Sequence, residues 1–167
     1  MAYSARMGLA FDPRHPSALA VYCSDGRFTR AVEALLRKLG HDRLDTMTLP
    51  GGPALLNHGP ADLSEVFIFS RATRFLIEAH EITHVVLLAH ENCGFYRARF
   101  GRLGDDRIRK IQIEHLQTGA RALARQHPGL AVACYYARVA DNQVAFDDVA
   151  REDTQAKSAE VAATSSG

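Results

Sequence analysis

The chain has 167 residues, of which 47% are hydrophobic, and carries a formal net charge of +1. This length and composition fit one domain with an ordinary core, which we predict over residues 1–150, and the small polar residues over 151–167 predict a disordered tail. The near-neutral charge gives no electrostatic reason to expect nucleic acid or a membrane as a partner. The first residues lack the apolar run of a signal peptide, and no segment is long enough for a membrane span, so a cytoplasmic protein is expected.

The first elements form a strand–helix–strand unit. A short apolar run predicts a buried strand over 17–24, and a helical pattern follows over 28–40. The apolar stripe of that helix is Phe28, Val32, Leu35 and Leu39. A second strand is predicted over 45–50, where Pro50-Gly51-Gly52-Pro53 ends it and is most simply a turn.

The second half of the chain continues the alternation. A helix over 61–82 has enough apolar residues to be well buried, and the uninterrupted apolar run over 83–90 is typical of a strand covered on both faces. A long, more polar helix is predicted over 105–126. The strands over 130–139 and 143–149 are separated by a turn sequence, which predicts a closing hairpin.

Strands that alternate with helices predict an α/β fold, with a central, mostly parallel sheet of about four strands, helices on both faces and an antiparallel edge. In open sheets of this kind, ligands bind beyond the carboxyl ends of the strands. Two groups of reactive side chains fall at such ends. Cys23, Asp25 and Arg27 come at the end of the first strand, and His90 and Cys93 come at the end of the third.

These side chains include the donors of a metal site. Two thiols and one imidazole form a soft ligand set that suits Zn²⁺, so Cys23, His90 and Cys93 are candidate zinc ligands. Three protein ligands leave a fourth position open, as catalytic zinc sites do. The chain has three cysteines, too few for a disulfide framework, and Cys134 lies in an apolar strand where a core position is expected.

Other chemistries need spacings that the sequence lacks. A phosphatase-type phosphate loop needs an arginine six residues after Cys23, and that position is Thr29. No Cys-x-x-Cys pair is present, and the glycines at 51 and 52 fit neither a dinucleotide fingerprint nor a Walker loop. A thiol-dependent enzyme that uses Cys23 as a nucleophile without metal stays open as a minor alternative.

The two motifs resemble the signatures of the β-class carbonic anhydrases. The segment Cys-Ser-Asp-Gly-Arg at 23–27 is similar to the Cys-x-Asp-x-Arg of that family, and His-Glu-Asn-Cys-Gly at 90–94 is similar to its His-x-x-Cys-Gly. The order of elements over about 17–149 is also similar. The resemblance implies that the two cysteines and the histidine bind zinc. It also implies that Asp25 either pairs with Arg27, leaving a water on the metal, or takes the fourth zinc position and closes the site.

The function implied by the resemblance is the reversible hydration of carbon dioxide to bicarbonate by a zinc-bound hydroxide. Asp25 would orient the hydroxide, and Arg27 would hold Asp25 in place through a bidentate pair. The family also implies a homodimer or a higher homo-oligomer. Two alternatives remain: hydrolysis of a related molecule such as carbonyl sulfide or carbon disulfide, and a zinc-binding protein without turnover.

Outside the motifs, the sequence departs from the family pattern and offers further candidates. The family usually has an Arg-Asn-Ala-Gly-type segment after its second strand, where this chain has Leu-Pro-Gly-Gly-Pro-Ala at 49–54. His58 is a candidate proton shuttle. A basic run follows the second motif and is either a solvated helix face or an attractor of the anionic product. Its members are Arg97, Arg99 and Arg102.

Overall fold

The computed structural model describes residue 8 and residues 10–57 and 62–149. The tail predicted over 151–167 and the candidate proton shuttle His58 lie outside these ranges. None of the helices in the described ranges is long and apolar enough to cross a membrane.

One five-stranded sheet organises the described residues, in the order β2-β1-β3-β4-β5. Along the chain its strands are β1 Ala18–Cys23, β2 Asp45–Leu49, β3 His84–His90, β4 Ala131–Ala140 and β5 Gln143–Asp148. The first four are parallel to one another, and β5 pairs antiparallel with β4. The predicted mostly parallel sheet with an antiparallel edge is therefore confirmed.

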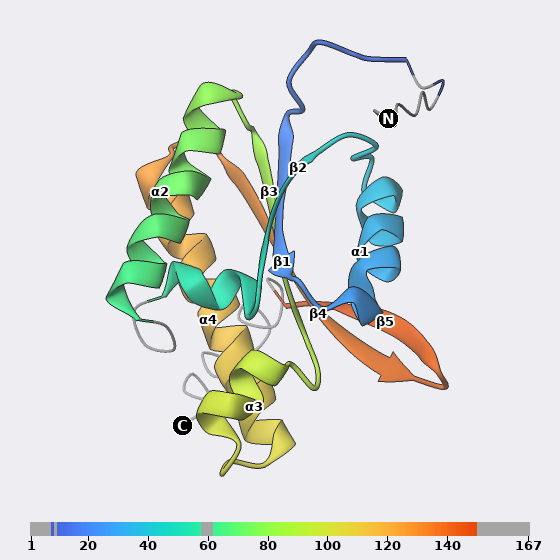
Figure 1. Cartoon of the computed structure of the whole chain (residues 1–167), viewed down its shortest axis with the longest axis vertical. Coiled ribbons are helices and arrows are strands. Elements are labelled where there is room, and N and C mark those ends of the chain that lie inside the picture. Colours follow the sequence, from blue (N-terminus) through green and yellow to red (C-terminus); the bar gives the residue numbers. More distant parts are fainter. Residues whose placement is uncertain (1–7, 9, 58–61, 150–167) are drawn as a thin grey trace, which may run out of the picture.

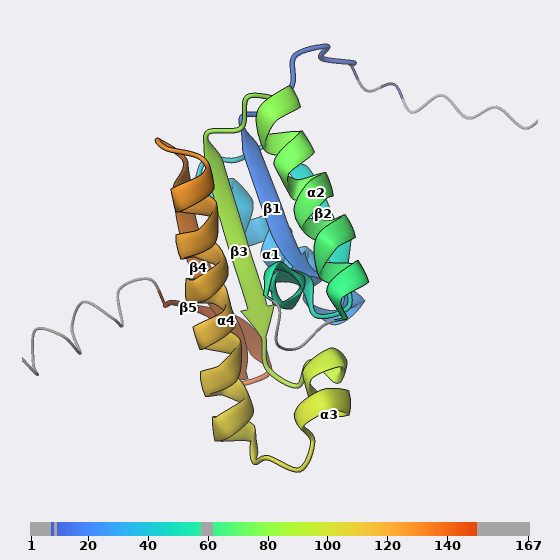
Figure 2. The ribbon, with the colours of Figure 1, turned by 90° about the vertical axis from the view of Figure 1, so that its left-hand side faces the viewer.

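The helices cover the two faces of this sheet (Figure 1). Helix α1, Gly26–Lys38, lies on one face, and α2, Leu63–Ala79, and α4, Asp105–Gln126, lie on the other (Figure 2). Because successive strand residues point to opposite faces, Leu19 packs toward α2 and α4 whereas Ala20 packs toward α1. The chain leaves β1 toward β2 and leaves β3 toward β4, so the strand order reverses between β1 and β3. Ligand sites of open α/β sheets lie at such a switch point.

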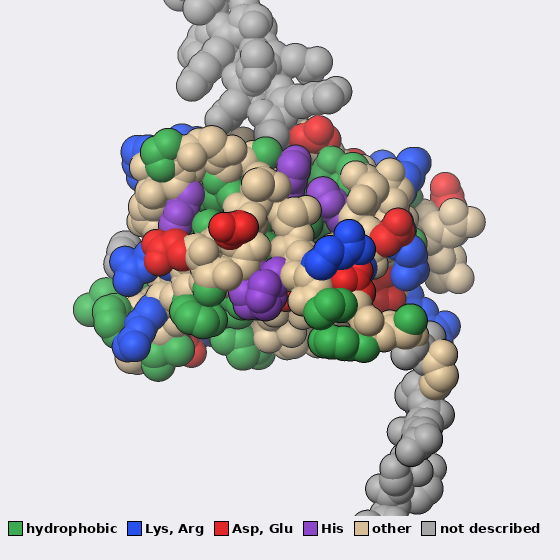
Figure 3. Space-filling model, turned by 90° about the horizontal axis from the view of Figure 1, so that it is seen from above, with side chains coloured by type: hydrophobic (Ala, Val, Ile, Leu, Met, Phe, Trp, Pro, Cys, Tyr) green, Lys and Arg blue, Asp and Glu red, His purple; other side chains and the backbone are tan. Residues whose placement is uncertain are grey.

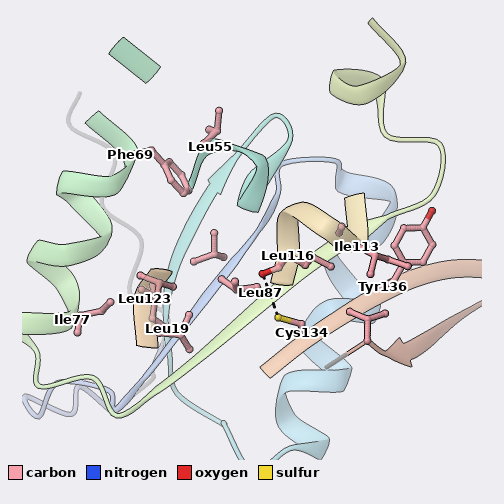
Figure 4. Packing of buried hydrophobic residues seen from close by; sticks show 14 of the residues in the cluster. Leu19, Leu55, Phe69, Ile77, Leu87, Ile113, Leu116, Leu123, Cys134 and Tyr136 are labelled. Carbon is pink, nitrogen blue, oxygen red and sulfur yellow. Dashed lines mark hydrogen bonds between the residues drawn. The ribbon is translucent and has the colours of Figure 1, made fainter. Parts of the chain in front are cut away.

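The larger core fills the space between the sheet and the helices α2 and α4 (Figure 4). Leu19 and Leu87 from the sheet meet Phe69 from α2 and Leu116 from α4, and all four are buried. Cys134 lies in this cluster with 1% of its surface exposed, and its thiol faces the Leu116 carbonyl at 3.7 Å. The prediction of a core role for Cys134 is confirmed.

Helix α2 is less buried than its apolar sequence suggests. One stripe faces the core, but the opposite side exposes 66% of Phe67, 66% of Ile68 and 62% of Phe75. The prediction of a well-buried helix is therefore wrong for the side that faces away from the sheet. A helix on a sheet buries one stripe, and composition alone does not say what covers the other.

Three local features also differ from the sequence prediction. In α1 the buried stripe continues through Leu36, because the i, i+4 spacing from Phe28 favours it, and Leu39 is 37% exposed. The segment after β2 is more than a turn, since it continues into a 3₁₀ helix, η1, over Gly52–Leu56. A short helix, α3, follows the second motif over Gly94–Phe100.

Histidines gather at the amino ends of the strands, the end of the molecule seen in Figure 3. His80 Nδ1 lies 2.6 Å from a carboxylate oxygen of Asp45, and its ring stacks on that of His15. His84 begins β3, whereas His90 ends it, and six residues of strand separate the two by roughly 20 Å. His80 and His84 therefore lie at the amino ends of the strands, and the candidate zinc ligands lie at the carboxyl ends.

Candidate metal centre

The candidate zinc ligands meet at the switch point of the sheet. Cys23 is the last residue of β1, His90 is the last residue of the neighbouring β3, and Cys93 is the N-cap of α3. Their ligand atoms all lie within 4.8 Å of one another, and the two sulfur atoms are 3.9 Å apart. Among the described residues this is the one such group of three. Parallel strands bring their carboxyl ends together, so residues distant in sequence converge here.

The imidazole of His90 is oriented for a metal. Its Nδ1 lies 2.8 Å from the carbonyl oxygen of Glu91, which can only accept, so Nδ1 carries the proton. The other nitrogen, Nε2, is then an acceptor, and it is buried without a hydrogen-bond partner within the described ranges. Buried polar atoms are rarely left unpaired, and a histidine that donates through one nitrogen commonly ligates through the other. The donor set and this orphaned nitrogen fit a zinc ion.

The sulfur atoms of Cys23 and Cys93 are within hydrogen-bond distance, 3.9 Å apart. The hydrogen bond from Cys93 is the main cause that lowers the pKa of Cys23, against burial, which raises it. The same hydrogen bond, together with burial, raises the pKa of Cys93, because losing its proton would place two negative charges side by side. A divalent cation in place of that proton would neutralise both sulfurs, as thiolate ligands require.

Asp25 and Arg27 form a bidentate ion pair beside the candidate ligands. Arg27 Nε lies 3.0 Å from Oδ1 of Asp25, and Arg27 Nη2 lies 2.6 Å from Oδ2. Arg27 Nη2 also donates to the carbonyl of Asn92 at 3.3 Å, which joins the first motif to the second. Asp25 Oδ2 is 4.0 Å from Nε2 of His90. Of the two arrangements that the family resemblance implies for Asp25, the structure contains the pair with Arg27.

This ion pair keeps Asp25 charged. Hydrogen bonds from the Arg27 side chain are the main reason that the pKa of Asp25 falls to about 2, against a partial desolvation that acts in the other direction. Asp25 is also the N-cap of α1 and accepts from the backbone N–H of Arg27 at 3.1 Å. At neutral pH it is therefore a fixed hydrogen-bond acceptor next to the candidate metal ligands.

A buried glutamine supports His90 and was missed by the sequence analysis. Gln112 of α4 is 1% exposed, and its Nε2 donates to the His90 carbonyl at 2.9 Å. The hydroxyl of Tyr136 donates in turn to Gln112 Oε1 at 3.4 Å. Gln112 lies at i, i+4 spacing between Ile108 and Leu116, so a polar residue in the apolar stripe was the available signal.

Replacing Gln112 with leucine should weaken zinc binding about tenfold, because support residues behind metal ligands typically contribute that much. The substitution keeps the side-chain volume but removes the donor to His90. Gln117→Leu is the matched control, since Gln117 lies on the same helix and donates to the Val149 carbonyl at 3.3 Å, away from the site. Competition with a chromophoric chelator measures both affinities. Equal losses in the two variants would contradict a specific role for Gln112.

Two arginines of the basic run after the second motif, Arg97 and Arg99, form ion pairs. Arg97 lies 2.8 Å from a carboxylate oxygen of Asp105. Arg99 lies 3.7 Å from Glu65, and its guanidinium stands over the Phe95 ring at 3.6 Å. These two arginines therefore tie α3 to α4 and α2. An attraction of anions by the run stays a prediction.

The fold and these residues define a class: an α/β protein with a candidate Cys-His-Cys metal centre at the switch point of its sheet. Solved structures that are similar to this chain include several β-carbonic anhydrases. The enzyme CafA of Aspergillus fumigatus is 20% identical, over 81% of this chain and 77% of that one, with a TM-score of 0.51. A tetrameric β-carbonic anhydrase of Sordaria macrospora is 14% identical, over 80% and 81%, with a TM-score of 0.51.

A third neighbour is the Coccomyxa β-carbonic anhydrase in complex with acetazolamide, which is 13% identical over 87% of this chain and 85% of that one, with a TM-score of 0.50. This chain therefore has the β-carbonic anhydrase fold, as its two motifs predict. The sequence matches no protein-family model and no curated protein.

Proposed function

We propose that this chain is a zinc-dependent carbonic anhydrase that interconverts carbon dioxide and bicarbonate. The observation that carries the proposal is the meeting of Cys23, His90 and Cys93 beside the Asp25–Arg27 pair. The β-carbonic anhydrase fold of the chain supports it. A divalent cation would neutralise the thiolates of Cys23 and Cys93. The carboxylate of Asp25 lies next to the candidate ligands, where it could accept a hydrogen bond from a nucleophile and orient it.

Each residue has a distinct role in this proposal. Cys23, His90 and Cys93 would hold the zinc ion, which supplies hydroxide from water near neutral pH, as zinc does with three histidines in other carbonic anhydrases. Asp25 would accept a hydrogen bond from the O–H group of the nucleophile. This bond would orient the nucleophile so that a lone pair of its oxygen points at the carbon of the substrate. Arg27 keeps the carboxylate charged and fixed in direction.

One observation favours a second candidate, the hydrolysis of a less polar relative of carbon dioxide such as carbonyl sulfide. The segment after β2 passes along Cys23, and its residues Gly51, Gly52, Pro53 and Ala54 present no polar side chain. Ala54 is buried in the same cluster as Cys23 and Cys93. On this side of the site, an apolar substrate would find apolar contacts. An anion such as bicarbonate would find no side chain that could donate a hydrogen bond to it.

Metal analysis and two assays test the proposal. We expect one zinc per chain, and carbon dioxide hydration in a stopped-flow pH-indicator assay. Release of hydrogen sulfide from carbonyl sulfide without hydration would favour the second candidate. Zinc without either activity would point to a binding protein. An enzyme that is active without zinc and inactivated by thiol alkylation would contradict the proposal and favour catalysis by Cys23.

We also propose that the chain forms a homo-oligomer. The exposed side of α2 carries three large apolar side chains, Phe67, Ile68 and Phe75, among charged ones. Beside it lies a hollow of about 440 Å³ lined by residues from α2, β2, η1 and α3. Contiguous exposed apolar surface is typical of interaction sites. The tetrameric Sordaria structure shows that the same fold can assemble.

The double substitution Phe67→Asp and Ile68→Asp should dissociate this oligomer, because each places a charge on the exposed side of α2 without touching the core. Phe11→Asp is the control, since Phe11 is an 88% exposed apolar residue that is not part of α2. Light scattering at micromolar concentration measures the mass. A monomeric wild-type chain, or a double variant with unchanged mass, would contradict this assembly surface.

A further inference from the structure

The segment that follows β2 lies unusually close to the strand that carries Cys23. Gly52 has a positive φ of +49°, and a Cβ atom built on it would lie 2.5 Å from the carbonyl carbon of Tyr22 and 2.6 Å from the nitrogen of Cys23. Real Cβ atoms do not approach backbone atoms so closely. The segment can occupy this place only because residue 52 has no side chain.

Gly51 makes the corresponding contact on the other side. Its φ is +84°, and a Cβ atom on it would lie 2.6 Å from Cδ1 of Phe95. Phe95 is in the first turn of α3, two residues beyond Cys93, which is the N-cap of that helix. Gly51 and Gly52 therefore stand between the two elements that carry the cysteines.

Hydrogen bonds fix this glycine pair in place. Ser24 donates its backbone N–H to the Leu49 carbonyl at 3.2 Å, and Ala54 donates to the Gly51 carbonyl at 3.1 Å. The segment is thus held to the end of β1 before it turns into η1, the teal turn that Figure 2 shows beside the end of that strand.

We propose that Gly51 and Gly52 are positioning residues of the metal centre, which set the spacing between Cys23 and Cys93. This rests on the proposed zinc site. A side chain at residue 52 pushes the segment away from Cys23, and a side chain at residue 51 pushes α3, and with it Cys93, away from the segment. Either change enlarges the 3.9 Å separation of the sulfurs.

The test compares Gly51→Ala and Gly52→Ala with wild type in zinc affinity and in the absorption spectrum of the cobalt-substituted protein. We expect zinc affinity to fall tenfold or more, and the thiolate-to-cobalt band to shift, since that band reports the geometry of the sulfurs. Gly40→Ala is the matched control, because Gly40 has a φ of +87° but open space around it. It carries the same backbone strain without a contact to the site.

A second substitution separates displacement from general destabilisation. The three atoms nearest to the Cβ atom at residue 51 all belong to the side chain of Phe95. Phe95→Ala in the Gly51→Ala background should therefore restore much of the lost zinc affinity. Wild-type affinity and spectrum in both glycine variants, or a loss no larger than that of Gly40→Ala, would overturn the inference. A wild-type chain that binds neither zinc nor cobalt would instead overturn the proposed function. If Gly52→Ala does not fold, Gly51→Ala and its double variant decide.

Discussion

Asp25→Asn is expected to retain zinc and to lose about a hundredfold or more of the carbon dioxide hydration rate, a typical cost of misplacing a reacting group. The amide has one acceptor oxygen and no charge. It therefore cannot both hold Arg27 in a bidentate pair and accept from the attacking oxygen. Asp25 is not among the three candidate ligands, so the metal content should not change.

Asp12→Asn is the matched control for this substitution. Asp12 pairs with Arg14 in the same arrangement, two residues apart along the chain, with Nε to Oδ1 at 3.0 Å and Nη2 to Oδ2 at 2.6 Å. That pair lies on the surface, away from the metal centre. Zinc analysis and stopped-flow rates of both variants separate a catalytic from a structural carboxylate. Turnover that survives Asp25→Asn undiminished would remove Asp25 from the mechanism.

The same ion pair predicts how acid affects the folded chain. The folded-state pKa of Asp25, about 2, is below its ordinary value of 3.8, so its ionisation favours the folded state above pH 4. That contribution is lost as the pH falls from 4 toward 2, because the carboxylate then takes up a proton. Above pH 4 Asp25 does not titrate. We therefore assign any change in turnover between pH 6 and 9 to another group.

The sheet and the ligand cluster are predictable because their causes are local or topological. The apolar run over 83–90 predicts β3, and the helix predicted over 105–126 is observed as α4 with the same bounds. Parallel strands have their carboxyl ends on the same side of the sheet. Cys23 and His90 therefore come close together independently of the loop conformations. No knowledge of side-chain packing is needed for either step.

The remaining parts of the site depend on packing between distant segments. The donor from Gln112 to His90 joins α4 to the end of β3, and only the polar residue in an apolar stripe hints at it. The role of Gly51 and Gly52 depends on how closely the end of β1 and the start of α3 approach these two glycines. In sequence, a Gly-Gly pair between prolines indicates only a turn. The exposed apolar side chains of α2 could not be predicted either, because the sequence does not say which of its apolar side chains lie against the sheet.

Zinc itself is expected to produce the largest change in stability. A ligand that binds only the folded state stabilises it by about 4 kcal/mol when present at a thousand times its dissociation constant. For a domain of this size, that raises the melting temperature by roughly 10 °C. Removal of zinc with a strong chelator should lower the melting temperature of the wild-type chain accordingly, and added zinc should restore it.

Cys93→Ser should abolish this zinc-dependent shift, because a serine hydroxyl stays protonated near neutral pH and is a poor replacement for a thiolate. Cys134→Ser is the control. That cysteine is 1% exposed and packs in the core, so the substitution lowers the melting temperature in both states but leaves the shift between them intact. Calorimetry with and without zinc gives both quantities. A Cys93→Ser variant that zinc stabilises as much as the wild type would show that the metal binds elsewhere. The Cys-His-Cys group would then be three core residues that happen to meet.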